Sequence, residues 1–327
     1  MDQWAGVGKR SMTADARRLI TLAGTSWSFD RASKHLKEFC HLEVSDDTIE
    51  RVCQEEGARA QQWIKASDEP AKAIRQAKGQ IEFSTDGVKV NTTESWREMR
   101  LSTIARRESA APCQSRDWDK RVLNRPAARV SICAIADAHH VGASWRRLSK
   151  QMSLASEPAV HVIADGAKWI WEQAGQRLPK HNGKWCVDVY HVSQHIHQCG
   201  KELFGENAQA RQWADEHLQT ALTKNGPALI ERIEREQSDT LDDQQHQALA
   251  KLLTYLKPHR DRMWYADRLQ SGQTIGSGLI EGGCKNTIGA RLKLNSARWR
   301  IQRAERIGML RCVESSNLWS NFWKTAA

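Results

Sequence analysis

The segment Val160–Trp171 constrains the fold most, because a short apolar run ends there in Asp165 and Gly166. A short apolar run bounded by glycine is typical of a buried central strand, and the aromatic segment after it is compatible with a helix. An acid at the C-terminal end of such a strand lies where open α/β sheets place their chemistry. The structural alternative for Asp165 is an N-cap of the next helix.

A second segment, Ile81–Val90, repeats this arrangement, because its strand pattern also runs into an Asp-Gly pair at Asp86. An acid that follows one predicted strand can be a cap, but two such acids on two strands are harder to explain that way. The sequence therefore predicts that the carboxylates of Asp86 and Asp165 converge on one metal site.

Alternating apolar and polar residues predict a β-hairpin from Ile81–Thr92 and Ser95–Arg107. Further strands are predicted over Val130–Asp137, over the apolar run at Val160, and over Lys184–His191, with helices between them. The order is three strands, a helix, a strand, a helix and a strand. This is the order of the ribonuclease-H-like fold, although other α/β folds share it.

Helical patterns dominate the rest of the chain. Residues 1–78 predict a helical, helix-turn-helix-like DNA-binding region, in which Ser28 and Ser45 precede two helices. A small helical bundle without DNA contact would give the same pattern. Residues 192–269 show no strand pattern and predict an all-helical insertion. The expected architecture is an α/β ribonuclease-H-like catalytic core (residues 79–191 and 270–327, with basic C-terminal helices), interrupted by this insertion and preceded by the helical N-terminal domain.

The charge of the chain favours a polyanionic partner. Lys and Arg number 49 against 39 Asp and Glu, a net charge of +10, and a basic surface gains affinity for nucleic acid by releasing counterions. No apolar run approaches the roughly 20 residues that span a bilayer, and the N-terminus has no secretory pattern. We therefore expect a cytoplasmic, nucleoid-associated protein. The 8 cysteines form no C-x-x-C pair, which argues against a zinc ribbon or a redox motif.

Glu281 lies near the start of a predicted helix, after a possible cap at Ser277, and basic residues follow it. An acid within a basic face suits metal-assisted phosphoryl transfer, because magnesium binds through one or two carboxylates together with substrate phosphate. A favourable interaction of Glu281 with the helix N-terminus is the alternative. His191 and His195 have the spacing of zinc ligands on a helix, but no Glu follows His191, so the HExxH arrangement is absent.

Four blocks carry a family resemblance: STDGVKVNTTESWREMRL, ADGAKWIW, VDVYH and GSGLIEGGCKNTIGARLK, the last followed by Trp299. In this order they resemble the DDE transposases of bacterial insertion sequences, in particular the ISKra group, over residues 81–323. The resemblance implies a ribonuclease-H-like core in which Asp86, Asp165 and Glu281 form the catalytic, metal-binding triad. It also implies that Asp188 and His191, which match an Asp-x-x-His signature beside the helical insertion, shape the site.

These observations predict a DNA transposase that cleaves the ends of an insertion sequence and transfers them into target DNA, with two Mg²⁺ or Mn²⁺ ions. The expected partner is double-stranded DNA, bound by a homo-oligomer, without a membrane. The expected DNA contacts are Lys285, Arg291, Lys293, Arg298 and Trp299. The alternatives are an inactive or truncated DNA-binding repressor and a nuclease of the same fold without strand transfer. Alternation in the predicted strand at Asp188 favours Glu281 over Asp188 as the third triad member.

Overall fold

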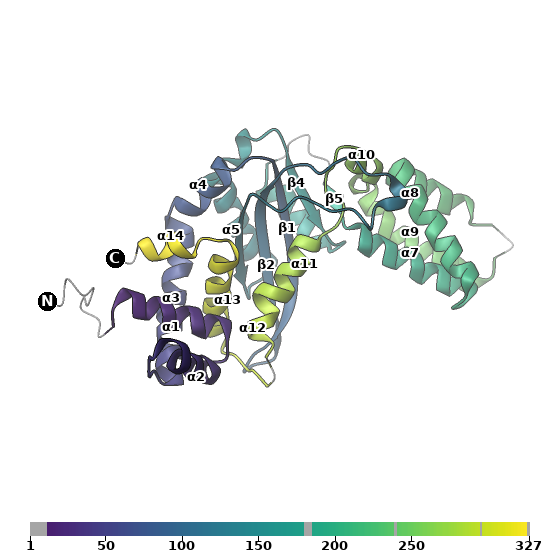
Figure 1. Ribbon diagram of the computed structural model, residues 1–327. Helices are drawn as coiled ribbons and strands as arrows, with labels where there is room; N and C mark the ends of the chain where they lie inside the picture. The colour runs from purple at the N-terminus through teal and green to yellow at the C-terminus, as the bar shows by residue number, and fades with distance from the viewer. Residues whose placement is uncertain (1–11, 180–184, 239–240, 295, 326–327) are drawn as a thin grey trace.

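The computed structural model describes residues 12–179, 185–238, 241–294 and 296–325 (Figure 1). At its centre lies a five-stranded sheet with the strand order β3-β2-β1-β4-β5. The antiparallel β1, β2 and β3 are neighbours, whereas β4 runs parallel to β1 and β5 parallel to β4. The bounds are β1 (Gln80–Asn91), β2 (Trp96–Arg107), β3 (Ala128–Ala134), β4 (Val160–Ala164) and β5 (Cys186–Val187). This mixed topology is compatible with the ribonuclease-H-like fold.

The hairpin expected from alternation is confirmed, since β1 and β2 pair from Gln80 with Arg107 to Asn91 with Trp96. Opposed residues of a sheet share a face, and successive residues alternate between faces. The Ser102 face of β2 meets α5 (Ala138–Gln151), where Trp145 Nε1 donates to Ser102 Oγ at 2.8 Å. The Leu101 face meets α11 (Gly278–Gly283), so closely that a Cβ on Gly283 would lie 2.8 Å from Leu101 Cδ2. The sheet is thus covered by helices on both faces, and α6 (Lys168–Arg177) packs beside α5.

The N-terminal helices begin at polar caps, as the sequence predicts. The side chains of Thr13, Ser28 and Ser45 each accept a hydrogen bond from the backbone N–H three residues on. The helices are α1 (Ala14–Ser26), α2 (Phe29–Cys40), α3 (Asp46–Ala66) and α4 (Glu69–Gln76). Helix α3 packs against α13 (Ile301–Ser315) near the other end of the chain, and a Cβ on Gly57 would lie 2.6 Å from Arg306 Cβ. Helices from the N-terminal and C-terminal parts of the chain therefore pack together (Figure 1).

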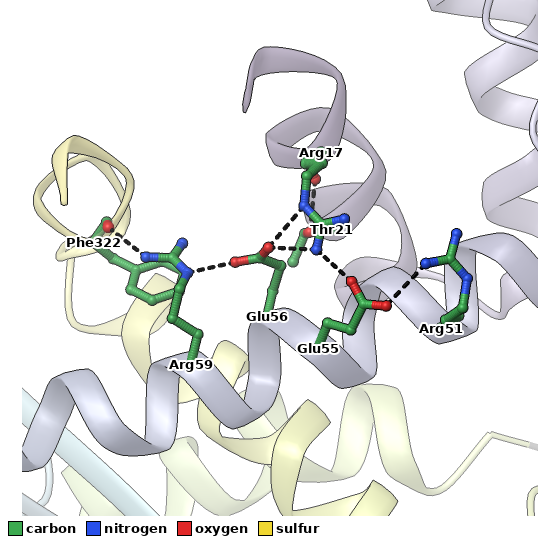
Figure 2. Close-up of polar contacts among 7 residues, drawn as sticks. All are labelled: Arg17, Thr21, Arg51, Glu55, Glu56, Arg59 and Phe322. Atoms are coloured by element: carbon green, nitrogen blue, oxygen red, sulfur yellow. Dashed lines mark hydrogen bonds and ion pairs between the residues drawn. The ribbon is translucent and has the colours of Figure 1, made fainter. Parts of the chain in front are cut away.

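A buried ionic network reinforces this contact (Figure 2). The Glu56 carboxylate accepts from Arg17 Nη2 and from Arg59 Nε, each at 2.6 Å. Arg59 also donates to the carbonyl oxygen of Phe322 at 3.1 Å, in α14 (Trp319–Lys324), and lies 3.6 Å from the centroid of the Phe322 ring. One glutamate thereby joins α1 to α3 and, through Arg59, to the last helix.

Every element that the structure describes between residues 192 and 269 is helical, as the sequence predicts, and these helices extend to one side of the sheet (Figure 1). They are α7 (Val189–Phe204), α8 (Ala208–Arg235), α9 (Asp243–Leu256), η3 (Lys257–Arg262) and α10 (Tyr265–Gln270). Helix α8 is kinked at Asn225, beside Gly226 and Pro227, where the Gly226 N–H donates to Met263 O. The proposed division of the chain into domains stays a prediction.

The remaining short elements are η1 (Ser115–Asp117), η2 (Leu154–Ser156), the π-helical turn η4 (Cys284–Gly289) and α12 (Ala290–Leu292). In the part of the chain that the structure describes, no helix has both the length and the apolar character that crossing a bilayer requires.

Candidate functional site

Asp86 and Asp165 lie at the same level of two neighbouring parallel strands. The last residue pair between β1 and β4 is Phe83 with Val162, and each acid comes three residues later in its own strand direction. The sequence placed Asp86 at the end of a strand. The structure corrects this, because β1 continues to Asn91 along its antiparallel partner. Asp86 lies where the parallel pairing has ended, which leaves space beside it on the β4 side. Both side chains are half-buried.

Local hydrogen bonds hold both carboxylates. Asp86 Oδ1 accepts from the Gly87 N–H at 2.6 Å, and Asp165 Oδ1 accepts from the Ala167 N–H at 3.0 Å. Asp165 thus bonds the N-cap residue of α6 and not an amide of its first turn, so it is not the helix cap considered as an alternative. The Cys284 thiol also bonds the Asp86 carboxylate, and the second oxygen of Asp165 is left for a further ligand.

Asp188 is the N-cap of α7, which corrects the predicted strand over Lys184–His191. Strand β5 contains only Cys186 and Val187, and Lys184 lies outside the described residues. Asp188 Oδ1 accepts from the Tyr190 N–H at 2.8 Å, and the capping preference of aspartate outweighs the strand preference of the valines around it. The helical turn brings His191 back to the carboxylate, with Nδ1 3.1 Å from Asp188 Oδ2.

Ser277 connects Asp188 to Glu281. Its hydroxyl lies 2.5 Å from Asp188 Oδ2 and 2.7 Å from Glu281 Oε1. The serine side chain does not cap α11, although its position suggests that role in the sequence. Glu281 is exposed and reaches over from the first turn of α11. Ser277 is thus a site residue that sequence reasoning missed, and its spacing of one helical turn from Glu281 is the signal that was available.

Asp188, His191 and Glu281 form a group that can hold a metal ion. One ligand atom from each lies within 4.8 Å of the others, and no other such group of three occurs in the part of the chain that the structure describes. Asp86 and Asp165 are not members of this group, and neither is His195, whose ring stacks on Tyr255. Strand alternation suggested that Asp188 points away from the site. The structure corrects this, because Asp188 is a member of the group. The assignment of Asp86, Asp165 and Glu281 as the triad stays a prediction.

The charges of the two sets of residues interact. Burial raises the pKa of Asp86, opposed by the Gly87 N–H and reinforced by the nearby Asp165 charge. The hydrogen bond to Asp188 raises the pKa of His191, and the charges of Asp165 and Glu281 act in the same direction. The strand carboxylates and the Asp188, His191 and Glu281 group thus belong to one electrostatic site.

Asp188 itself is held in its ionised form. Burial alone would raise its pKa, but hydrogen bonds from His191, Ser277 and the Tyr190 N–H outweigh burial and lower the pKa. A buried carboxylate that stays ionised is the type of ligand that a divalent cation requires.

The basic residues after Glu281 separate into two kinds. Lys285, Lys293 and Arg298 are exposed and accessible to a phosphate, and Arg298 Nη2 also donates to Thr93 O at 3.5 Å. Arg291 and Trp299 were also expected to contact DNA, but both are buried, with 3% and 7% of their surface exposed. The Arg291 guanidinium donates to Gly24 O at 3.0 Å and lies 4.8 Å from the centroid of the Phe29 ring, which leaves it a packing role between α12 and the N-terminal helices.

Comparisons with known proteins leave the family open. No family model matches the chain, and no curated protein matches it. Among solved structures, the chain is similar to the Drosophila P element transposase strand transfer complex, with 11% sequence identity over 99% of this chain and 84% of that chain and a TM-score of 0.33. A TM-score that low carries no argument about fold or function. The resemblance to the ISKra group stays a prediction.

Proposed function

We propose that the chain is a DDE-type DNA transposase that cleaves DNA at the ends of an insertion sequence and joins them to target DNA. The observation that carries the proposal is the convergence of acids beyond the end of the parallel pairing between β1 and β4, two inner strands of the sheet. Asp86 and Asp165 each lie three residues beyond the last pair between the parallel strands β1 and β4, and the group of Asp188, His191 and Glu281 is electrostatically coupled to them. Acid-rich sites on α/β sheets of this kind suit phosphoryl transfer.

The donor set fits divalent cations. Four carboxylates offer the oxygen ligands that Mg²⁺ prefers, and His191 adds a nitrogen that Mn²⁺ also accepts. We assign one ion to the strand acids Asp86 and Asp165, and a second to Glu281 with Asp188 and His191. When bound, such ions neutralise phosphate charge and favour ionisation of the attacking hydroxyl.

The residues of the chain position the reacting groups. Asp188 is fixed by three donors, so its free lone pairs point in set directions. Ser277 contacts both Glu281 and Asp188, and it thereby fixes the position of Glu281 relative to Asp188. Ser277 and Asp188 are 89 residues apart in the sequence. The exposed Lys285, Lys293 and Arg298 supply contacts to the DNA backbone, which fix the register of the duplex without reading its sequence. Positioning of this kind supplies much of the catalysis in phosphoryl transfer.

The N-terminal helices are proposed to hold the element ends. Helices α2 and α3 are joined by a short turn, as in a helix-turn-helix, and α2 carries exposed basic residues. Because two element ends must be processed together, we propose that the chain acts on DNA as a homo-oligomer, in association with the nucleoid.

The test uses the full chain and a supercoiled plasmid that carries its coding locus with the natural flanking DNA, in Mg²⁺ or Mn²⁺. A transposase yields cuts at defined flanking positions and joined products. A repressor binds this DNA without cutting, and a nuclease cuts without joining, so either result overturns the proposal. In Asp188→Asn we expect cutting to fall by at least about 100-fold, since ionised ligands are lost.

The matched control is Asp137→Asn. Asp137 is also a helix N-cap that pairs with a histidine three residues on, since it accepts from the His140 N–H and lies 2.8 Å from the His140 ring nitrogen, but it is exposed and outside the candidate metal group. We expect cutting by this variant to stay within about twofold of that of the unaltered chain. Equal losses in both variants would show that capping, and not metal binding, explains the effect.

A further inference from the structure

Tyr255 of α9 brings the helical insertion into contact with the loop after Asp165. Its ring stacks on His195 with centroids 3.7 Å apart and meets His259 edge-on at 5.4 Å. A Cβ on Gly166 would lie 2.5 Å from Tyr255 Cε2, so only glycine allows the ring to come this close to Asp165. The Tyr255 ring is thus fixed on three sides.

The support for this ring is itself rigid. Arg262 donates to His259 Nδ1 at 3.1 Å, and His259 also bonds the Gly166 backbone. The tyrosine is therefore clamped between the insertion and the loop after Asp165, and a hydroxyl on such a ring has a set direction.

The Tyr255 hydroxyl is buried and has no hydrogen-bond partner among the described residues. A buried donor without a partner destabilises the folded chain, so the missing partner of Tyr255 calls for an explanation. Burial, with the charges of Asp165 and Asp188, raises the pKa of Tyr255 above its ordinary value. The hydroxyl therefore stays protonated at neutral pH and is available as a donor.

The nearby carboxylates of Asp165 and Asp188 do not accept from this hydroxyl. Asp165 accepts from the Ala167 N–H, and Asp188 accepts from Tyr190 and Ser277. We propose that the Tyr255 hydroxyl donates a hydrogen bond to a non-bridging oxygen of the phosphodiester held at the acidic site, so that the helical insertion supplies a substrate contact. This inference rests on the proposed function.

The chain contains only 3 tyrosines, which makes a direct spectroscopic test practical. The full chain is labelled with 3-fluorotyrosine, and its three fluorine resonances are assigned from single Tyr→Phe variants. The probe is a plain DNA duplex with Ca²⁺, which supports binding without cutting. We expect the Tyr255 resonance to shift when the duplex is added, and not with Ca²⁺ alone. The resonance of Tyr265, whose hydroxyl donates to Val187 O at 2.9 Å, should stay in place.

The same variants separate function from stability. Tyr255→Phe removes a buried, unpaired hydroxyl, so we expect an unfolding midpoint that does not fall and that rises if anything, together with a cutting rate that falls about tenfold or more. Tyr265→Phe is the matched control: it loses a buried hydrogen bond, so its unfolding midpoint should fall, while its cutting rate stays within about threefold.

The outcomes are distinguishable. A Tyr255 resonance that does not move with DNA, or that moves equally with Ca²⁺ alone, overturns the phosphate contact. Wild-type rates in Tyr255→Phe also overturn it and leave the proposed function standing. If the unaltered chain cuts no DNA in either Mg²⁺ or Mn²⁺, the proposed function fails, and this inference fails with it.

Discussion

Replacement of Glu56 by glutamine tests how strongly the N-terminal helices are tied to the rest of the chain (Figure 2). The two side chains have nearly the same shape, so the packing of α3 is preserved. The change removes one negative charge and converts one acceptor oxygen into a donor NH₂. Arg17 and Arg59 bond different oxygens of Glu56, so one of them must then face a donor.

The size of the effect follows from burial. The side chains of Arg17 and Glu56 are 5% and 2% exposed, and removal of one partner from a buried ion pair costs about 3 to 5 kcal/mol. Arg17 keeps its bond to Glu55 at 2.8 Å, and Arg59 keeps its bond to Phe322 O. We therefore expect a loss near the lower limit, about 3 kcal/mol, which is a large part of the roughly 5 to 15 kcal/mol that stabilises a typical protein.

The assay is urea unfolding followed by tryptophan fluorescence, with Glu55→Gln as the matched control. Glu55 also bonds Arg17, but its side chain is 45% exposed, so its replacement should cost no more than about 1 kcal/mol. If Glu56→Gln and Glu55→Gln lower the free energy of unfolding by the same amount, burial does not strengthen this network and the reasoning is wrong.

Two further predictions concern pH and DNA contact. Burial is the main cause that lowers the pKa values of His161 and His259 from 6.5 to about 4. Between these two pH values the unfolded chain therefore binds more protons than the folded chain. The free energy of unfolding should thus fall as the pH falls from about 6.5 to about 4. Replacing both histidines by glutamine should make the unfolding midpoint depend less on pH over this range. An unchanged pH dependence would contradict the assignment of this effect to His161 and His259. Lys293→Ala should weaken duplex binding and reduce its salt slope by about one phosphate without a change in stability. Arg291→Ala should lower the unfolding midpoint instead, and the reverse pattern in these two variants would refute the division between exposed and buried cations.

The strands were predictable because their signal is local. Apolar and polar residues alternate over Ile81–Val90 and after Ser95, and this pattern indicates a half-buried hairpin independently of the elements that pack on it. The apolar run at Val160 indicates a central strand. Alternation over Ile81–Thr92 included Asp86 in a strand, but the sequence could not show that this residue lies beyond the parallel pairing with β4. Its position depends on where the parallel pairing with β4 stops, which is a property of two strands and not of one.

The site was less predictable, because its contacts join distant segments. VDVYH has the composition of a strand, yet Asp188 caps a helix, and the capping bond that decides between them is formed only after β5 ends. Ser277 lies beside Asp188 only in the folded chain. Charge patterns likewise placed Arg291 among the DNA contacts, although the face of a short helix such as α12 cannot be derived from three residues.

The positions of Asp188 and Ser277 also connect the helical insertion to the acids. Asp188 begins the first helix of the insertion, and Ser277 follows its last helix, so the hydrogen bond between them closes the neck through which the chain leaves and re-enters the sheet. Two backbone bonds reinforce this neck, from the Val189 N–H to Ile275 O and from the Asp188 N–H to Ala164 O, directly before Asp165. A rotation of the insertion must therefore pull on Asp188, Glu281 and the Asp165 loop together. The neck thus ties the helical insertion to the acids of the candidate site through hydrogen bonds on three segments of the chain.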